Sequence, residues 1–172
     1  MSTMASGLLL ADRIWIAVAL LHRELPNHED FSKDEIRSKL DELGLTTPGE
    51  RPSVHPHLKQ HMVANAPPST TKKYRMLFGT PSGNLRLYRP GDSVDIGRQS
   101  HRSPKYAPNR SDIPPKYHAL LDWYEEWNRT ASPNQPANYE DDPLIRLIGS
   151  GKHIWADEHA DEYVENLRRE DV

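Results

Sequence analysis

The chain has 172 residues, of which 35% are hydrophobic and 15 are proline, and its mean hydropathy is −0.82. This length and composition predict one domain with an appendage that packs poorly in part. The absence of cysteine excludes disulfides and thiolate chemistry and fits a reducing compartment. The apolar N-terminal run, residues 8–21, is interrupted by Asp12 and Arg13 and is too short to span a bilayer. We therefore expect a soluble cytoplasmic protein with no membrane association.

The net charge of −3 conceals an uneven distribution. Residues 1–50 carry five Lys/Arg against nine Asp/Glu, residues 51–110 carry eleven against two, and residues 111–172 carry six against fourteen. The central part is therefore +9, between parts of −4 and −8. Such a basic segment favours a polyanionic partner, because each phosphate contact releases condensed counterions. The alternative is that oppositely charged solvated faces simply neutralise each other.

The first fifty residues predict two amphipathic helices. The first covers about residues 8–24, and its apolar positions share one face: Leu10, Ile14, Ala17, Val18 and Leu21. The second begins at a capping box, in which the Ser32 hydroxyl and the Glu35 carboxylate satisfy each other's backbone N–H groups. Gly44 is expected to end this second helix, as the residue just after its C-cap. Phe31, just before the cap, is either a hydrophobic staple or a short strand that enters a sheet.

A third helix and a hairpin follow in residues 51–88. Val54, Leu58 and Met62 recur at a spacing of four and predict the buried stripe of a helix with Ser53 as a candidate N-cap. Two strand-like runs, residues 74–78 and 85–88, flank a turn-forming loop at 79–84. Three helices followed by a two-stranded wing is the order of a winged helix-turn-helix. The predicted fold class is therefore α+β, mostly α: a winged helix-turn-helix over residues 1–90, followed by a helical C-terminal extension.

Residues 12–90 resemble the winged-helix domain of many uncharacterised prokaryotic proteins. The resemblance lies in Asn65-Ala-Pro67, in Tyr74-Arg-Met-Leu-Phe78 and in the wing strand Arg86-Leu-Tyr-Arg-Pro90. It implies a module that binds double-stranded DNA, although some winged helices serve only protein contacts. It implies neither a reaction nor a particular operator.

Within that frame, two groups of residues are candidates for DNA contacts. The outer face of the third helix would present side chains to base edges or phosphates in the major groove: Ser53, His57, Lys59 and Gln60. The hairpin and the residues before it would neutralise phosphates or enter the minor groove: Lys72, Lys73, Arg75, Arg86 and Arg89. For each of these cations, a plain solvated surface charge is the alternative.

Catalysis and metal binding find no support in the sequence. His57 and His61 share a helix face at a spacing of four, but no third ligand accompanies them. Gly149-Ser-Gly-Lys152 lacks the spacing of a phosphate-binding loop. We therefore predict no enzyme activity, no cofactor and no metal site.

Residues 91–113 are polar and basic without apolar periodicity, which predicts a basic linker. The segment would serve either as an arm along a phosphate backbone or as a mere tether. Residues 114–172 are predicted as an acidic helical extension with an internal linker near 130–141. Its helix at residues 116–129 carries an aromatic and aliphatic stripe: Tyr117, Leu120, Leu121, Tyr124 and Trp127.

Such a wide stripe must be buried on the chain's own winged helix, on a second copy or on another protein. We expect a homodimer whose contacts include this stripe. The tail, with Trp155 and a helix near residues 158–170, is loosely similar to the tails of VapB-type antitoxins. Candidate protein-binding residues are Tyr117, Leu121, Tyr124, Trp127 and Trp155. The chain is thus predicted to be a DNA-binding protein that acts as a transcriptional regulator. The alternative is an antitoxin-like or adaptor protein whose acidic tail binds a protein partner.

Overall fold

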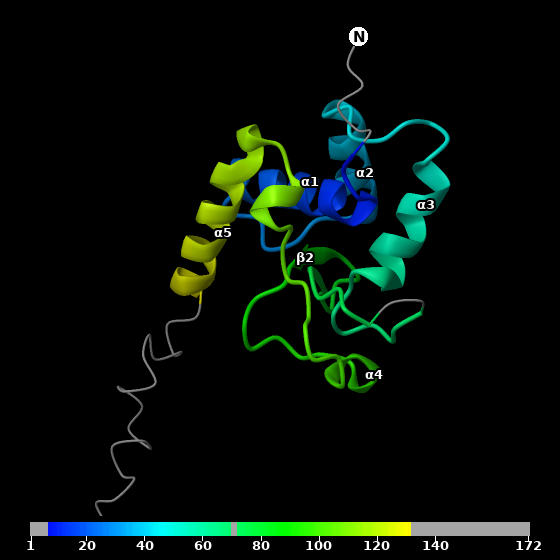
Figure 1. Cartoon of the computed structure of the whole chain (residues 1–172), viewed down its shortest axis with the longest axis vertical. Coiled ribbons are helices and arrows are strands. Elements are labelled where there is room, and N and C mark those ends of the chain that lie inside the picture. The colour runs from blue at the N-terminus through cyan, green and yellow to red at the C-terminus, as the bar shows by residue number, and fades with distance from the viewer. Residues whose placement is uncertain (1–6, 70–71, 132–172) are drawn as a thin grey trace, which may run out of the picture. The chain divides into compact units, whose positions relative to one another are not determined.

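The computed structural model describes residues 7–69 and 72–131, and the fold it shows is mixed α+β and mostly helical (Figure 1). The α-helices are α1 (Leu10–Glu24), α2 (Lys33–Glu42), α3 (Arg51–Pro56), α4 (Ile96–Gln99) and α5 (His118–Ala131). The strands are β1 (Leu77–Gly79) and β2 (Leu85–Leu87). A π-helical turn, η1 (His57–His61), continues α3, and the 3-10 turns η2 (Arg110–Asp112) and η3 (Pro115–Tyr117) precede α5. The α+β, mostly α, class that the sequence predicts is confirmed.

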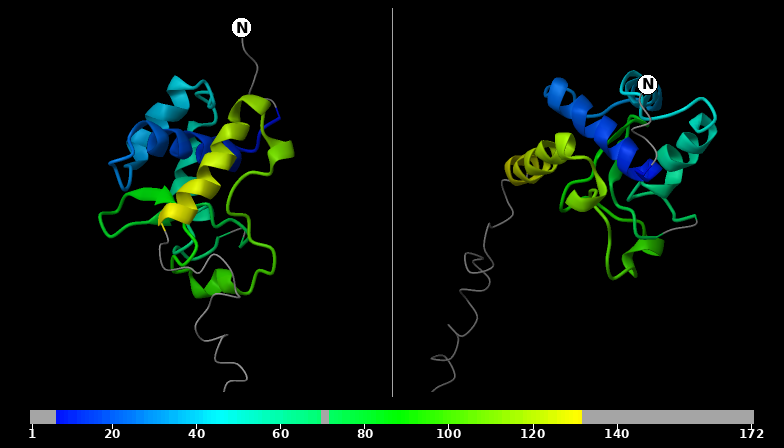
Figure 2. Two further views of the ribbon diagram at one scale, coloured as in Figure 1. Left: turned by 90° about the vertical axis from the view of Figure 1, so that its left-hand side faces the viewer. Right: turned by 45° about the horizontal axis from the view of Figure 1, so that its top comes forward.

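Helix α1 forms the centre of the core. Every residue from Ala11 to Ala19 is buried, so the helix is covered on all sides and not only on the predicted face. Helices α2 and α5 and strand β2 contact α1, and α3 lies on the side of α1 opposite to α5 (Figures 1 and 2). An α-helix that is apolar nearly all round has to be enclosed in this way. Among the described residues, no helix is long and apolar enough to cross a membrane.

Helix α2 begins and ends as the sequence predicts. The Ser32 N–H donates to Glu35 Oε2 at 2.7 Å and the Glu35 N–H donates to Ser32 Oγ at 3.2 Å, which confirms the capping box. Gly44 has a φ of +61°, a conformation that costs glycine little, and it lets the Leu45 N–H reach the Leu40 carbonyl at 2.9 Å. Local chemistry alone therefore sets both ends of this helix.

Helix α3 differs from the prediction at both ends. It begins at Arg51 with Glu50 as its N-cap residue, so the assignment of Ser53 as N-cap is wrong. Pro56 lacks the N–H that an α-helix needs, and the chain continues as the π turn η1. In that turn the Met62 N–H donates to the carbonyl five residues back, on His57, at 3.2 Å. Val54, Leu58 and Met62 are buried, as their spacing predicts.

The hairpin forms in the predicted place, with shorter strands. β1 and β2 pair antiparallel, with Leu77 opposite Leu87 and Gly79 opposite Leu85. Phe31 adds a bridge to the sheet, exchanging backbone hydrogen bonds of 2.8 and 2.9 Å with Leu85. Of the two alternatives for Phe31, the short strand is therefore what forms.

Residues 91–113 are part of the folded unit, and the prediction of a linker is wrong for them. The segment contains α4 and η2, and the side chain of Arg98 is 0% exposed. The Lys105 ammonium lies 2.8 Å from the carboxylate of the buried Asp12 on α1. Part of the polar composition of the segment therefore serves internal contacts, although many of its other residues are exposed.

The stripe on α5 packs within the chain itself. Tyr117, Leu120, Leu121 and Tyr124 are buried in the same core as α1. The Tyr124 ring meets the Trp15 ring edge-to-face with centroids 5.4 Å apart, and its hydroxyl donates to the Tyr88 carbonyl at 2.5 Å. Helix α5 extends to Ala131, so the prediction of a linker near 130–141 is wrong for residues 130–131, and its remaining residues lie outside the described part of the chain.

Candidate nucleic-acid interface

The third helix presents a polar face opposite its buried stripe. Ser53 and Lys59 are exposed, while His57 and Gln60 are half-buried. Burial of Val54, Leu58 and Met62 on the other side fixes which side chains face outward. The structure therefore brings together the four residues that the sequence predicted for this helix.

His57 has a defined orientation within this face. Its Nδ1 lies 2.8 Å from the Ser53 carbonyl, and because a carbonyl only accepts, Nδ1 carries the proton in this contact. The His57 and His61 rings stack with centroids 5.0 Å apart. Burial, with the neighbouring His57 and Arg98, holds the pKa of His61 below its usual range. Within the described residues, no group of three or more metal-ligating side chains gathers here or elsewhere.

Three exposed or half-exposed side chains beside this face were missed from the sequence. Arg51 and His55 precede Lys59 by eight and four residues, so helical spacing alone could have identified the stripe. Arg37 comes from α2, and its guanidinium donates to His55 Nδ1 at 2.9 Å and to Asp34 at 2.7 Å. Only the packing of α2 beside α3 brings Arg37 to this surface, and no local sequence signal indicates it.

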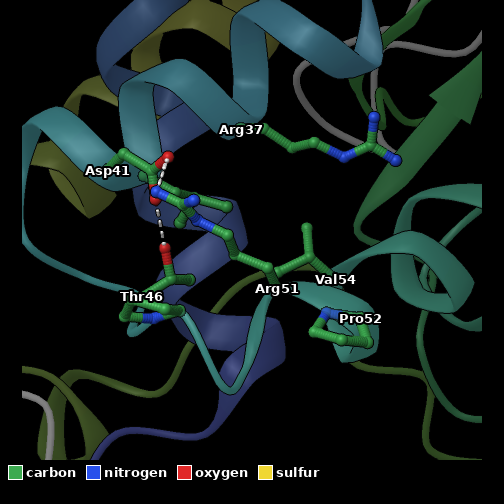
Figure 3. A pocket seen from close by; sticks show the side chains of 8 residues that line it. Arg37, Asp41, Thr46, Arg51, Pro52 and Val54 are labelled. Carbon is green, nitrogen blue, oxygen red and sulfur yellow. Dashed lines mark hydrogen bonds and ion pairs between the residues drawn. The ribbon is translucent and has the colours of Figure 1, made fainter.

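A cleft of about 530 Å³ lies between α2 and α3, and Figure 3 shows it from close by. Its lining is apolar in the middle and charged at the ends: Arg37, Leu40, Asp41, Thr46, Pro48, Arg51, Pro52 and Val54. The guanidinium of Arg51 turns toward Asp41, to which it donates at 2.9 Å, while that of Arg37 points to the opposite end (Figure 3). The two arginines therefore mark two separate positions for an anionic group and do not converge on one.

The hairpin is not the basic wing that the sequence predicted. Arg86 makes a bidentate pair with Asp92, at 2.7 and 2.6 Å, and its guanidinium covers the Phe78 ring. The Arg89 guanidinium lies 4.1 Å from the centre of the Trp127 ring. Asp30 accepts hydrogen bonds from three side chains of the turn: Thr80, Ser82 and Asn84. Both arginines are thus occupied by internal contacts, and the turn is held by a carboxylate.

Arg75 also differs from its predicted role. It donates to the Arg98 carbonyl at 2.8 Å and to the Tyr106 hydroxyl at 3.4 Å. Lys72 and Lys73, by contrast, are exposed, directly after the two residues that the structure does not describe. Of the five cations predicted around the hairpin, the two lysines keep the exposure that a phosphate contact requires.

Part of the charge of the basic segment is balanced within the chain. Arg51 pairs with Asp41, Arg86 with Asp92, Lys105 with Asp12, and Arg110 with Asp122. Arg98 is buried among carbonyl groups. A positive sum over residues 51–110 therefore overstates the charge presented to a partner, which agrees with the alternative of mutual neutralisation.

The predicted protein-binding residues fall into two groups. Tyr117, Leu121 and Tyr124 are buried on α1, and Trp127 is half-buried beneath Arg89, so this stripe is structural in the chain itself. The stripe therefore offers little exposed surface for the predicted homodimer contact. Trp155 and the remainder of the acidic tail lie outside the described residues.

Comparison with known protein families, with curated proteins and with solved structures gives no match to this chain. The arrangement of its own residues is what bears on function. The polar face of α3 and η1, the adjoining cleft and the Lys72–Lys73 pair form the candidate interface.

Proposed function

We propose that this protein binds double-stranded DNA, as a transcriptional regulator, through a winged helix-turn-helix that spans about residues 12–90. The order of elements supports the proposal: α1, the Phe31 bridge, α2, α3 with η1, and then the β1–β2 hairpin. In a winged helix, the bridge from Phe31 to Leu85 would correspond to the first strand of the sheet. The alternative of an antitoxin-like adaptor depends on the tail, which lies outside the described residues.

The observation that carries the proposal is the face of α3 and η1. A helix anchored by Val54, Leu58 and Met62 presents Lys59 and Gln60 outward, and these two side chain types read guanine and adenine edges in a major groove. Four cations lie around the face: Lys72 and Lys73 are exposed, whereas Arg37 and Arg51 would exchange their carboxylate partners, Asp34 and Asp41, for phosphates. The arginines of the hairpin make contacts within the chain, so the hairpin would contribute its shape, and not positive charge, to the DNA interface.

The test is fluorescence anisotropy of a labelled random-sequence duplex, titrated with the intact protein at two salt concentrations. Four phosphate contacts predict a slope of roughly −3.6 in log affinity against log salt, which is shallower than the eleven basic residues of the segment suggest. Folded protein that fails to bind at low salt would rule out the proposal.

A set of substitutions distinguishes base contacts from phosphate contacts. Lys59→Ala and Gln60→Ala are expected to change the sequence preference of the protein, by about 1–3 kcal/mol at the affected base pair. Lys72→Ala should weaken all duplexes alike and reduce the salt slope by about 1. Arg23→Ala is the matched control, because Arg23 is exposed at the C-terminal end of α1, which points away from α3 (Figure 2). An equal effect of Arg23→Ala would show that binding depends on general charge.

A further inference from the structure

The π turn η1 interrupts the regular hydrogen bonding of the helix that carries the candidate DNA-contacting residues. Pro56 cannot donate a backbone hydrogen bond, so the regular α-helical series stops there. The turn that follows is of a kind that seldom forms alone, because its hydrogen bonds reach five residues back. Lys59 and Gln60 both stand on this turn. Something other than local backbone preference has to keep these two side chains in their orientation.

Arg98 supplies that support from another part of the chain. Its Nε donates to the Ala66 carbonyl at 2.7 Å, and its Nη1 to the carbonyls of Tyr74 at 3.0 Å and His61 at 3.3 Å. Its Nη2 donates to the carbonyl of Gln60. A guanidinium suits this position, since it is a planar fork of five N–H donors and carries a positive charge next to the carbonyl end of a helix. The side chain is completely buried, so these contacts do not compete with water.

Helix α4, which carries Arg98, is itself held in place. Asp95 caps it by accepting from the Gly97 N–H at 2.8 Å, and the Asp95 N–H donates to the Ala64 carbonyl at 2.9 Å. Arg75 donates to the carbonyl of Arg98. Gly97 is closely packed, because a Cβ there would lie 2.9 Å from Pro68. These contacts tie the short helix that carries Arg98 to the segment around Ala64 and to Arg75.

We propose that Arg98 is a positioning residue for the DNA interface: by holding the carbonyls of Gln60 and His61, it fixes the π turn and with it the orientation of the Lys59 and Gln60 side chains. The inference rests on the proposed function for its effect on DNA, whereas its effect on the turn is independent of DNA. Arg98 itself is enclosed and touches no ligand. It would determine sequence preference through the backbone that it holds.

The first measurement is amide hydrogen exchange of residues 57–63 in the intact protein, by NMR. Arg98→Ala is expected to speed exchange in η1 at least roughly tenfold more than in α2, because the turn opens locally while the rest of the core persists. Arg98→Lys, which keeps the positive charge but not the planar fork of donors, should speed exchange in η1 to an intermediate extent. It replaces Arg98→Ala in the measurement if that variant does not fold. Lys39→Ala is the matched control, because Lys39 is a buried cation that pairs with Glu24 and Glu42 and not with η1.

The second measurement is the ratio of affinities for the duplex that the wild-type protein selects from a random library and for a scrambled duplex. Arg98→Lys should reduce this ratio roughly tenfold, the range of a single lost base contact, without changing the salt slope. Exchange in η1 that is unchanged in both Arg98 variants overturns the positioning role. If exchange rises but the ratio stays constant, the link to DNA is overturned; if the wild-type protein binds no duplex, the proposed function fails while the exchange result still decides the role of Arg98 in the turn.

Discussion

At the scale of single residues, His22 shows how burial turns a titratable group into a pH-dependent element of stability. Its side chain is 4% exposed, its Nε2 accepts from the Leu87 N–H at 3.3 Å, and its ring contacts the rings of Phe31 and Trp127. Burial, together with the positive charges of Arg89 and Arg86, lowers the pKa of His22 to about 4. The folded protein therefore excludes a proton that the unfolded chain accepts below its ordinary pKa of about 6.5.

The stabilising effect of the neutral His22 is complete above pH 6.5 and is lost as the pH falls toward 4. We expect the free energy of unfolding to drop by roughly 2–3 kcal/mol between pH 7 and pH 4.5 from this residue, as measured by urea denaturation at both pH values. His22→Gln should remove that difference, whereas His55→Gln, at an exposed histidine, should retain it. An identical pH dependence in the wild-type protein and in His22→Gln would contradict the assignment.

At the scale of elements, α5 completes the core. Leu121 is buried against α1, so Leu121→Ala is expected to lower the free energy of unfolding by about 2–5 kcal/mol. Glu125→Ala, an exposed change on the same helix, should stay within about 0.5 kcal/mol of the wild-type protein. If the stripe served only a dimer, the effect of Leu121→Ala would instead depend on protein concentration, which denaturation at two concentrations would reveal.

Elements whose ends depend on neighbouring residues could be predicted from the sequence, whereas contacts between distant segments could not. The capping box at Ser32 and the stop at Gly44 follow local rules and are confirmed. The start of α3 was missed because Glu50 is held by Arg13, which lies 37 residues earlier. Arg98 was assigned to a linker because its carbonyl partners on Gln60 and Tyr74 are 38 and 24 residues away. A polar segment whose side chains donate hydrogen bonds to the backbone carbonyls of another segment has the same composition as a segment that is exposed to water.

The same limit applied to the candidate interface. The outward face of α3 was predictable from the burial of Val54 and Leu58, since helical spacing fixes the opposite side. The internal roles of Arg86 and Arg89 could not be predicted from the sequence. Their partners, Asp92 and Trp127, are acidic or aromatic residues whose positions depend on the fold. Positive charge in a strand predicts a phosphate contact only where no internal partner is in reach.

For the whole molecule, internal ion pairs hold the central segment to the rest of the fold. Lys105 is largely buried and pairs with Asp12, which is fully buried on α1. Lys105→Met would leave that carboxylate without its cation, and we expect a loss of about 3–5 kcal/mol of unfolding free energy in thermal or urea denaturation. Arg110→Gln breaks the exposed pair with Asp122 and should cost less than about 1 kcal/mol. Equal losses of unfolding free energy in the two variants would mean that the burial of Asp12 does not determine how much its pair with Lys105 stabilises the protein.

The packing of α5 on α1 also determines when the protein can fold during its synthesis. Trp15 is enclosed partly by Tyr124, which is more than a hundred residues later in the chain. At about 5–20 residues per second, a ribosome needs roughly 5–20 s to add that much chain. Throughout this interval the nascent α1 has an uncovered indole and neighbouring aliphatic side chains, which makes it a natural substrate for chaperones that hold emerging polypeptides. Helix α1 is thus synthesised before the other described helices and is among the last of them to be fully buried.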